Sequence, residues 1–317
     1  MKILSTDGFS STGIRLLEES GHEVLEHKIA SEHLANFINE NSIDVLIVRS
    51  RTKVTKELLS KCENLKIVGR GGVGLDNIDT EFAKEKGITV LNTPFASSRS
   101  VAEMVFAHFF TLSRQLQEAN RLMPLEGETR FNELKKSLSN GKELEGKTLG
   151  VIGFGAIGQE VVKIGIALGM KPKVLTRTPK SVSLSLSFYD GQKVSFQVES
   201  TNDMKAFLSD VDFLSINTPK TQEYIIDAPE FDCMKEGVFI VNTARGGVLN
   251  EVALIDAIED KVVCGAALDV FEKEPHPELA ILMNPALSLS PHLGGSTKDA
   301  QDKIALELAQ KIIEHIN

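Results

Sequence analysis

Short apolar runs alternate with amphipathic segments along the first part of the chain. Runs such as Asp44–Arg49 and Lys66–Gly69 have the length and apolar content of buried strands, whereas Ser31–Asn39 and Thr80–Lys86 repeat apolar residues at helical spacing. This alternation predicts a mostly parallel sheet with helices on both faces. The pattern indicates an α/β domain that ends near Pro94.

A longer amphipathic stretch follows, and it predicts one helix from about Ser98 to Leu122 because it contains no internal proline or glycine. The apolar stripe of this helix consists of Val101, Val105, Phe109, Leu112 and Leu116. The residues that follow, 124–147, are polar and interrupted by glycine, and they predict an arm or linker.

A second alternating unit begins near Thr148. It opens with an apolar strand, Leu149–Ile152, then a glycine-rich turn and a helix that reaches about Leu168. This order is typical of a doubly wound nucleotide-binding domain, and a last helix is predicted at Thr297–His315. The further predicted strands are Lys173–Thr176, Phe213–Asn217, Val238–Asn242 and Val263–Leu268.

Within this unit, residues 182–198 predict a β-hairpin. Apolar and polar residues alternate on both sides of Asp190-Gly191, a pair that favours tight hairpin turns. The sequence does not assign the hairpin to packing, subunit contact or cofactor choice.

Composition limits the function classes. The chain has 317 residues, a length typical of about two domains, with 42% hydrophobic and 25% charged residues. Its formal net charge of -9 gives no electrostatic support for binding nucleic acid or an anionic membrane. No apolar stretch approaches the roughly 20 residues of a membrane helix, and the amino terminus lacks the apolar core of a signal peptide. The cysteines, Cys62, Cys233 and Cys264, lack metal-binding spacing and favour reduced thiols in a cytoplasmic protein.

The glycine-rich turn carries the first chemical signal. Gly153 permits a sharp turn, Gly155 lets the backbone approach a pyrophosphate, and Gly158 allows close packing of helix on strand. The helix then begins at Ala156 and Ile157, where free N–H groups and a partial positive charge favour phosphate. This predicts a dinucleotide site.

Three further segments follow this turn in order: 242–247 (Asn-Thr-Ala-Arg-Gly-Gly), 269–275 (Asp-Val-Phe-Glu-Lys-Glu-Pro) and 290–297 (Ser-Pro-His-Leu-Gly-Gly-Ser-Thr). With the glycine turn, they resemble the D-isomer-specific 2-hydroxyacid dehydrogenase family. The resemblance covers nearly the whole chain. It implies two doubly wound α/β domains, with a Rossmann dinucleotide-binding domain (98–288) inserted into a flavodoxin-like substrate domain (1–97 plus 289–317).

The resemblance also implies the catalytic residues. Arg245 would hold a carboxylate and polarise the adjacent C2 oxygen, which a guanidinium does well. His292 would exchange the hydroxyl proton as hydride moves, with Glu274 behind it to favour the protonated ring. Asp269 would lie near the nicotinamide, although a loop or capping role competes with that assignment. No metal is expected.

The cofactor is expected to be NAD, with NADP possible. NAD-selecting folds place an acid at the end of the second strand, but this chain has Arg177 there, a residue that can pair with a 2′-phosphate. The resemblance also places Thr218, Pro219 and Ala244 at the cofactor. The residues Asn217, Thr218 and Lys220 depart from the family's usual phrase around Pro219.

Two arginine-bearing phrases in the first domain resemble family members that oxidise 3-phosphoglycerate. They imply a substrate site at Arg49, Arg70, Gly71 and Gly72, with Arg51 and Lys53 as additional cations. The expected partner is thus a small phosphorylated 2-hydroxy or 2-keto acid. The alternatives are an NADP-dependent glyoxylate or hydroxypyruvate reductase and a nucleotide-sensing, corepressor-like protein.

A homodimer is expected through the long helix, and activity without serine feedback is expected because no appended regulatory domain follows the last helix.

Overall fold

The computed structural model describes residues 1–316, and the chain divides into two compact units. The first comprises Met1–Ser98 and the chain from Gly295 onward, and the second comprises Arg99–Gly294. The sequence-based return to the first domain at residue 289 differs from this boundary. The difference arises because a last strand, β13 (Leu287–Leu289), extends the second sheet, and the residues after it stay bound to that unit.

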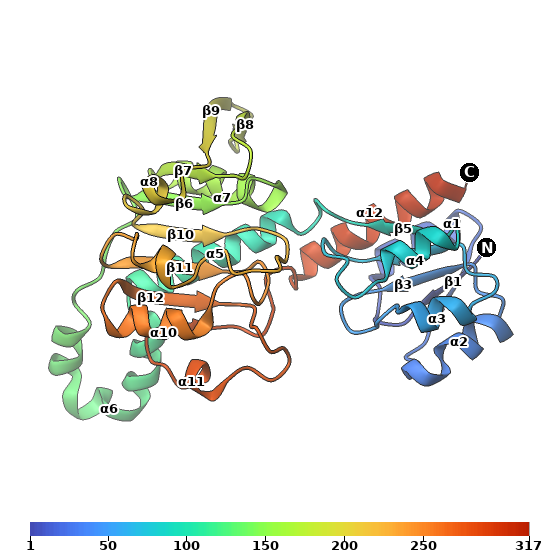
Figure 1. Cartoon of the computed structure of the whole chain (residues 1–317), viewed down its shortest axis with the longest axis horizontal. Helices are drawn as coiled ribbons and strands as arrows, with labels where there is room; N and C mark the ends of the chain where they lie inside the picture. Colours follow the sequence, from blue (N-terminus) through green and yellow to red (C-terminus); the bar gives the residue numbers. More distant parts are fainter. Residues whose placement is uncertain (317) are drawn as a thin grey trace. The chain divides into compact units, whose positions relative to one another are not determined.

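The first unit contains a five-stranded parallel sheet in the order β2-β1-β3-β4-β5, the flavodoxin-like order (Figure 1). Its strands are β1 (Lys2–Ser5), β2 (Glu23–Glu26), β3 (Val45–Val48), β4 (Ile67–Arg70) and β5 (Thr89–Asn92). Its helices are α1 (Ser11–Glu19), α2 (Ser31–Glu40), α3 (Lys56–Lys61), α4 (Thr80–Glu85) and α12 (Lys298–Ile316). These bounds agree with the predicted elements to within about two residues.

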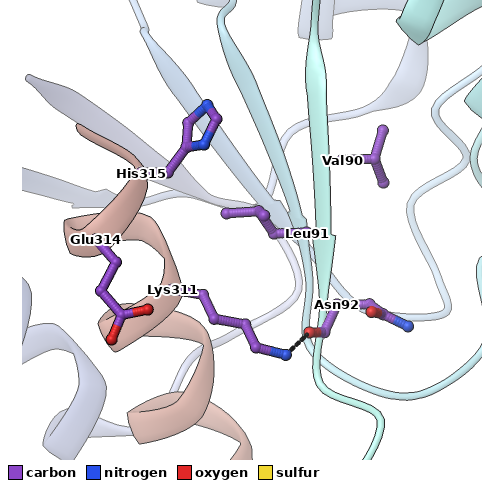
Figure 2. A pocket seen from close by; sticks show the side chains of 6 residues that line it. All are labelled: Val90, Leu91, Asn92, Lys311, Glu314 and His315. Carbon is purple, nitrogen blue, oxygen red and sulfur yellow. Dashed lines mark hydrogen bonds between the residues drawn. The ribbon is translucent and has the colours of Figure 1, made fainter. Parts of the chain in front are cut away.

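Alternating strand residues build a core on each face of this sheet. Leu46 and Val48 of β3 pack with α2, α3 and α4, whereas Val45 and Ile47 pack with α1 and α12. The terminal helix therefore completes the first unit, as the family resemblance implies. A pocket of about 400 Å³ lies between β5 and α12 and is lined by Asn92 and Lys311 among others (Figure 2).

The second unit contains an eight-stranded sheet in the order β13-β12-β11-β10-β6-β7-β9-β8, parallel except for the β8–β9 pair. Its other strands are β6 (Thr148–Ile152), β7 (Lys171–Leu175), β8 (Ser181–Ser187), β9 (Lys193–Thr201), β10 (Phe213–Ile216), β11 (Val238–Asn242) and β12 (Val263–Leu268). Its helices include α7 (Ala156–Ala167), α8 (Met204–Leu208), α9 (Ala228–Phe231), α10 (Glu251–Glu259) and α11 (Leu279–Leu282). This is the doubly wound order of a nucleotide-binding sheet.

The predicted hairpin is present as β8 and β9, with Gly191 at positive φ in its turn. The end of β9 also pairs with β7 through Ser200 and Thr201, so the hairpin supplies a strand of the main sheet. Figure 1 shows the rest of the hairpin projecting from this unit.

The prediction of one helix from Ser98 to Leu122 is wrong. The helix α5 (Ser98–Ser113) ends at Ser113, and α6 (Leu116–Ser137) begins after Gln115, whose φ of 54° is left-handed. Residues predicted as an arm are therefore largely helical, with Pro124 inside α6. The stripe is buried from Val101 to Leu112, but Leu116 is 47% exposed. Among residues 1–316, no helix combines the length and apolar character needed to cross a membrane.

Candidate active site

The glycine turn lies where the strand order of the second sheet reverses, between β6 and β10. Doubly wound sheets bind ligands at such a point. Gly153 has a φ of 91°, and a Cβ there would lie 2.4 Å from the carbonyl oxygen of Asn217. A Cβ on Gly158 would lie 2.1 Å from the oxygen of Gly153, whereas one on Gly155 would have no neighbour within 4 Å. The outer glycines permit close backbone contact, and the middle one faces open space.

The surroundings of this turn fit the pyrophosphate of a dinucleotide. The helix α7 begins at Ala156 and Ile157 without a side-chain cap, so its first N–H groups remain available. On the β10 side, Thr218 Oγ1 is buried and has no hydrogen-bond partner among residues 1–316. Pro219, which follows it, is exposed. Hydrogen-bond donors, the α7 N–H groups and the Thr218 hydroxyl, therefore lie on both sides of the turn. This arrangement fits a nicotinamide dinucleotide.

The end of the second strand of this sheet carries cations and no acid. Arg177 is exposed and makes no hydrogen bond or ion pair within residues 1–316. Lys180, which the sequence analysis did not single out, donates from Nζ to the carbonyl oxygen of Phe154 at 3.0 Å. A cation therefore lies against the glycine turn itself, which sequence spacing alone did not indicate.

Arg245 follows β11 in a loop that its neighbours hold. The Asn242 side chain accepts from the Ala244 backbone at 3.0 Å and donates to the Arg245 carbonyl oxygen at 3.1 Å. A Cβ on Gly246 would lie 1.7 Å from the carbonyl oxygen of Phe271. Glycine thus lets this loop contact the segment that carries Glu274.

Asp269 follows β12 and is 1% exposed. Its Oδ1 accepts from the Ser290 hydroxyl at 2.6 Å and from the Leu293 N–H at 2.7 Å, and its Oδ2 accepts from the Gly294 N–H at 2.8 Å. Its backbone oxygen accepts from the His292 N–H at 2.9 Å. The carboxylate therefore clamps the loop that carries His292, in agreement with the competing loop role.

His292 and Glu274 form a hydrogen-bonded ion pair, with 3.0 Å between Nδ1 and Oε2. The hydrogen bond to Glu274 raises the pKa of His292 against the opposing effects of burial and of Arg245. Burial acts to raise the pKa of Glu274, but hydrogen bonds from His292 and from the Phe271 N–H hold it below its usual value. With Nδ1 engaged by the carboxylate, Nε2 is the nitrogen that can exchange a proton. The charge of Arg245 lowers the pKa of both groups, so the three predicted catalytic residues lie within electrostatic range of one another in the second unit.

In the first unit, Arg49 and Arg70 lie at the carboxyl ends of the adjacent strands β3 and β4. The Gly71 N–H donates to the Val48 carbonyl oxygen at 2.9 Å. A Cβ on Gly72, whose φ is 145°, would lie 1.8 Å from Arg70 Nη1. The structure thus groups Arg49, Arg70, Gly71 and Gly72 at one edge of the sheet.

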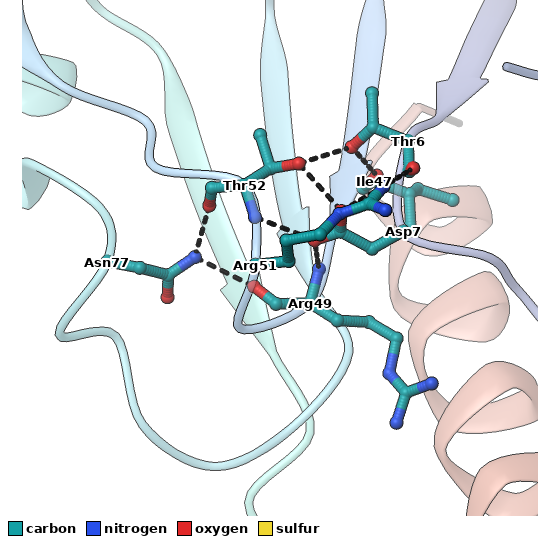
Figure 3. Close-up of polar contacts among 7 residues, drawn as sticks. All are labelled: Thr6, Asp7, Ile47, Arg49, Arg51, Thr52 and Asn77. Atoms are coloured by element: carbon teal, nitrogen blue, oxygen red, sulfur yellow. Dashed lines mark hydrogen bonds and ion pairs between the residues drawn. The ribbon is translucent and has the colours of Figure 1, made fainter. Parts of the chain in front are cut away.

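Asp7, at the end of β1, organises the loop that follows β3 (Figure 3). Its carboxylate accepts from the Arg49 and Thr52 N–H groups, from the Thr52 hydroxyl and from Arg51 Nε. Asn77 donates to the carbonyl oxygens of Arg49 and Thr52 at 2.7 Å each. Burial acts to raise the pKa of Asp7, but these bonds and the Arg51 charge lower it overall. The strands β1 and β3 flank the point where the order of this sheet reverses.

The two loop arginines therefore differ. Arg51 is bound to Asp7 and to the Thr6 carbonyl oxygen. The Arg49 guanidinium points away from this cluster in Figure 3 and has no hydrogen-bond or ion-pair partner among residues 1–316. The expectation that Arg51 adds to the substrate cations is not supported, because its charge is already neutralised. Among the described residues, no group of three or more His, Cys, Asp or Glu side chains could hold a metal ion.

Comparison with known proteins agrees with this geometry. Residues 106–294 match the family model described as D-isomer specific 2-hydroxyacid dehydrogenase, NAD binding domain. The chain is 39% identical over 306 residues to a hydroxypyruvate reductase of Thermotoga maritima, covering 95% of this chain and 93% of that protein. It is also 39% identical over 320 residues to a D-3-phosphoglycerate dehydrogenase of Methanocaldococcus jannaschii, covering 98% of this chain but only 57% of that protein.

A solved D-mandelate dehydrogenase of Rhodotorula graminis shares the fold, with a TM-score of 0.84 at 20% identity over 98% of this chain and 93% of that one. The chain belongs to the D-isomer specific 2-hydroxyacid dehydrogenase family. It is an NAD(P)-dependent enzyme of that family.

Proposed function

We propose that this enzyme is a D-3-phosphoglycerate dehydrogenase, which reversibly oxidises 3-phosphoglycerate to 3-phosphohydroxypyruvate in serine biosynthesis. The observation that carries the proposal is Arg49, whose backbone N–H is bound by Asp7 at the end of β3 and whose guanidinium has no partner among residues 1–316. A phosphate is a chemically fitting partner for such a guanidinium. The phosphoglycerate dehydrogenase relative supports the same substrate class.

The catalytic chemistry in this proposal is carried by three residues of the second unit. Arg245 binds the substrate carboxylate and the C2 oxygen, where positive charge stabilises developing negative charge. His292 accepts the C2 hydroxyl proton at Nε2 during oxidation and returns it during reduction. Glu274 holds Nδ1 and stabilises the imidazolium. A nicotinamide held at the glycine turn would supply the hydride acceptor for oxidation and the hydride donor for reduction.

The remaining contacts are assigned by the same reasoning. We place the phosphate of the substrate at Arg49 and Arg70, with N–H groups of Gly71 and Gly72 beside its anionic groups. The pyrophosphate of the cofactor would be held at the α7 amino terminus by the turn made of Gly153, Gly155, Ala156, Ile157 and Gly158. Thr218, Pro219 and Ala244 would line the rest of the dinucleotide site, for which NAD is proposed. Asp269, whose carboxylate is occupied by Ser290, Leu293 and Gly294, would act through the loop that it holds.

A second candidate is an NADP-dependent glyoxylate or hydroxypyruvate reductase. Two observations favour it. Arg177 is exposed with its charge unpaired, which suits a 2′-phosphate, and the hydroxypyruvate reductase relative matches over 93% of its own length. This candidate shares the same acid–base residues and differs only in cofactor and in the substrate's phosphate.

The separating experiment follows nicotinamide absorbance while NADH and NADPH are each offered with phosphohydroxypyruvate, hydroxypyruvate and glyoxylate. The proposal expects the highest kcat/KM with phosphohydroxypyruvate. It also expects Arg49→Gln to lower that value roughly 100-fold, in line with the loss of a charged hydrogen bond, and to leave glyoxylate reduction within about twofold. Lys61→Gln, which removes an exposed cation of α3 outside the proposed substrate site, is the matched control. Equal effects of Arg49→Gln on phosphorylated and unphosphorylated acids would favour the reductase.

The oligomer in this proposal is a homodimer. Exposed apolar side chains on α5 and α6 support it, because such residues gather on surfaces that bind another protein. Light scattering should give twice the mass of one chain, and Leu125→Glu with Phe131→Glu should yield monomers. A monomeric wild-type protein would exclude the dimer. The exposed residues are Phe110, Leu116, Met123, Leu125 and Phe131.

A further inference from the structure

One buried histidine lies outside the catalytic pair. His108 is in the middle of α5, is 6% exposed, and packs against the last strand of the second sheet. Its Nδ1 is 3.1 Å from the Ser288 hydroxyl, and its Nε2 is 3.1 Å from the Ser290 hydroxyl. Both ring nitrogens are therefore in hydrogen bonds, as buried polar atoms require, and one of the two partners, Ser290, also binds Asp269.

The hydrogen bonds determine which nitrogen of His108 carries the proton. Ser290 donates its only hydroxyl proton to Asp269 Oδ1 at 2.6 Å, since a carboxylate can only accept. The Ser290 oxygen must then accept from His108, which requires a proton on Nε2. In the neutral ring, Nδ1 is left as an acceptor for the Ser288 hydroxyl. Burial lowers the pKa of His108, outweighing the opposing effect of Asp269, and this agrees with a neutral ring.

This chain of hydrogen bonds ends at the catalytic loop. Asp269 Oδ1 accepts from both Ser290 and the Leu293 N–H, and His292 lies between these two residues. The backbone of His292 has a φ of 55°, a left-handed conformation that a side-chain-bearing residue keeps only when its surroundings impose it. The residues that impose it here are those bound to Asp269.

We propose that His108 is a positioning residue for the acid–base histidine: its Nε2–H holds the Ser290 hydroxyl on Asp269, and the three residues together fix the loop on which His292 stands. This inference rests on the proposed acid–base role of His292. It adds a buried residue of α5, distant in sequence, to the residues on which turnover depends.

The tautomer is tested directly by nitrogen NMR of protein labelled at histidine, with and without NADH. The His108 signals, assigned by their absence in His108→Gln, should show a protonated Nε2 and an unprotonated Nδ1 at neutral pH. A protonated Nδ1 or a charged ring would overturn the proposal. This measurement needs no substrate, so it stands even if the proposed activity fails.

Kinetics then test the positioning role, using whichever 2-keto acid the wild-type enzyme reduces. His108→Leu should lower kcat roughly tenfold, the scale of one lost buried hydrogen bond, with the affinity for NADH within about twofold of wild type. His108→Gln, whose amide can donate near the position of Nε2, should recover most of that loss. Ser113→Ala is the matched control, because this buried hydroxyl lies on the same helix but binds only the Phe110 carbonyl oxygen.

A double-mutant cycle separates positioning from a general loss of packing. Ser290→Ala and His108→Leu act through the same hydrogen bonds, so the double variant should be about as slow as the slower single variant. Additive losses, or no recovery in His108→Gln, would overturn the proposal. If His108→Leu does not fold, the cycle is run with His108→Gln and Ser290→Ala. There, a kcat in His108→Gln as low as that of Ser290→Ala would overturn the proposal.

Discussion

Replacing Glu274 by glutamine should damage catalysis more than replacing it by alanine. Glu274 Oε1 accepts from the Phe271 N–H at 3.0 Å, and Oε2 faces His292 Nδ1 at 3.0 Å. In Glu274→Gln, the amide oxygen must take the position that accepts from Phe271. The amide nitrogen then faces Nδ1, and two donors oppose each other whenever Nδ1 carries a proton. The reacting imidazolium carries that proton.

Two physical effects set the size of the expected loss in kcat/KM: the loss of charge attraction and the opposition of two donors. Opposite charges about 4 Å apart near a protein surface attract by about 4 kcal/mol, and solvent screening of this half-exposed pair reduces that to about 1–2 kcal/mol, or about tenfold in rate. The opposed donors also remove the correctly oriented acid–base group, whose usual contribution is about 10²–10⁴. We therefore expect kcat/KM to fall about 10²–10⁴-fold in Glu274→Gln and about 10–100-fold in Glu274→Ala. At one pH, the equilibrium constant requires equal losses in both reaction directions if cofactor affinity is unchanged.

The assay is kcat/KM for keto-acid reduction as a function of pH. Reduction needs imidazolium, so in the wild-type enzyme it falls as pH rises through the raised pKa of His292. Both variants remove the carboxylate that raises this pKa, so the fall should occur at lower pH. Glu278→Gln is the matched control, since this nearby carboxylate pairs with Lys273. A glutamine variant more active than the alanine variant refutes the opposed-donor argument, and an unmoved midpoint refutes the charge argument.

Three further predictions follow from other parts of the structure. Gly158→Ala should abolish nucleotide binding measured by fluorescence, because the added Cβ would lie 2.1 Å from a backbone oxygen. In Gly155→Ala the added Cβ would have no neighbour within 4 Å, so this variant should fold normally and lose only affinity for the nucleotide. Asp7→Ala should reduce the free energy of unfolding in urea by about 1–3 kcal/mol at about pH 7. Because the folded-state pKa of Asp7 is lowered, its contribution is lost as pH falls through that pKa, and the difference should shrink toward about pH 3; an equal difference at both pH values would contradict this. Burial raises the pKa of Cys62 to about 11, so a thiol reagent should modify exposed Cys264 but not Cys62 until the protein unfolds.

Periodicity predicted most strands of both sheets because buried strands such as β3 and β11 are continuous apolar runs, but it missed the short strand β13. Periodicity failed where the backbone departs from the conformation that the local sequence favours. Gln115 ends α5 in a left-handed conformation, although its neighbours continue a helical pattern. Pro124 lies inside α6, although proline normally ends a helix. Such departures depend on tertiary contacts, which hydrophobic periodicity does not carry.

The candidate site, like the fold, could be predicted from the sequence only in part. Arg245, Glu274 and His292 were predicted because each lies in a recognisable phrase, and the structure pairs His292 with Glu274. Asp269 was also predicted as a site residue, but the three donors that occupy its carboxylate come from a loop more than twenty residues later in the chain. The part played by His108 was not visible at all, since its two partners lie 180 and 182 residues away.

The arginines of the β3 loop show why residue type alone could not define the substrate site. Arg49 and Arg51 are two positions apart, with the same charge, in the same loop. Their contacts with Asp7, which follows another strand, are different. Asp7 accepts a hydrogen bond from the Arg49 backbone, whereas it forms an ion pair with the Arg51 side chain. The Arg51 guanidinium is therefore paired, whereas that of Arg49 has no partner among residues 1–316. In the proposed function, the unpaired Arg49 guanidinium at the end of β3 pairs with the phosphate of the substrate, a group that an unphosphorylated acid lacks.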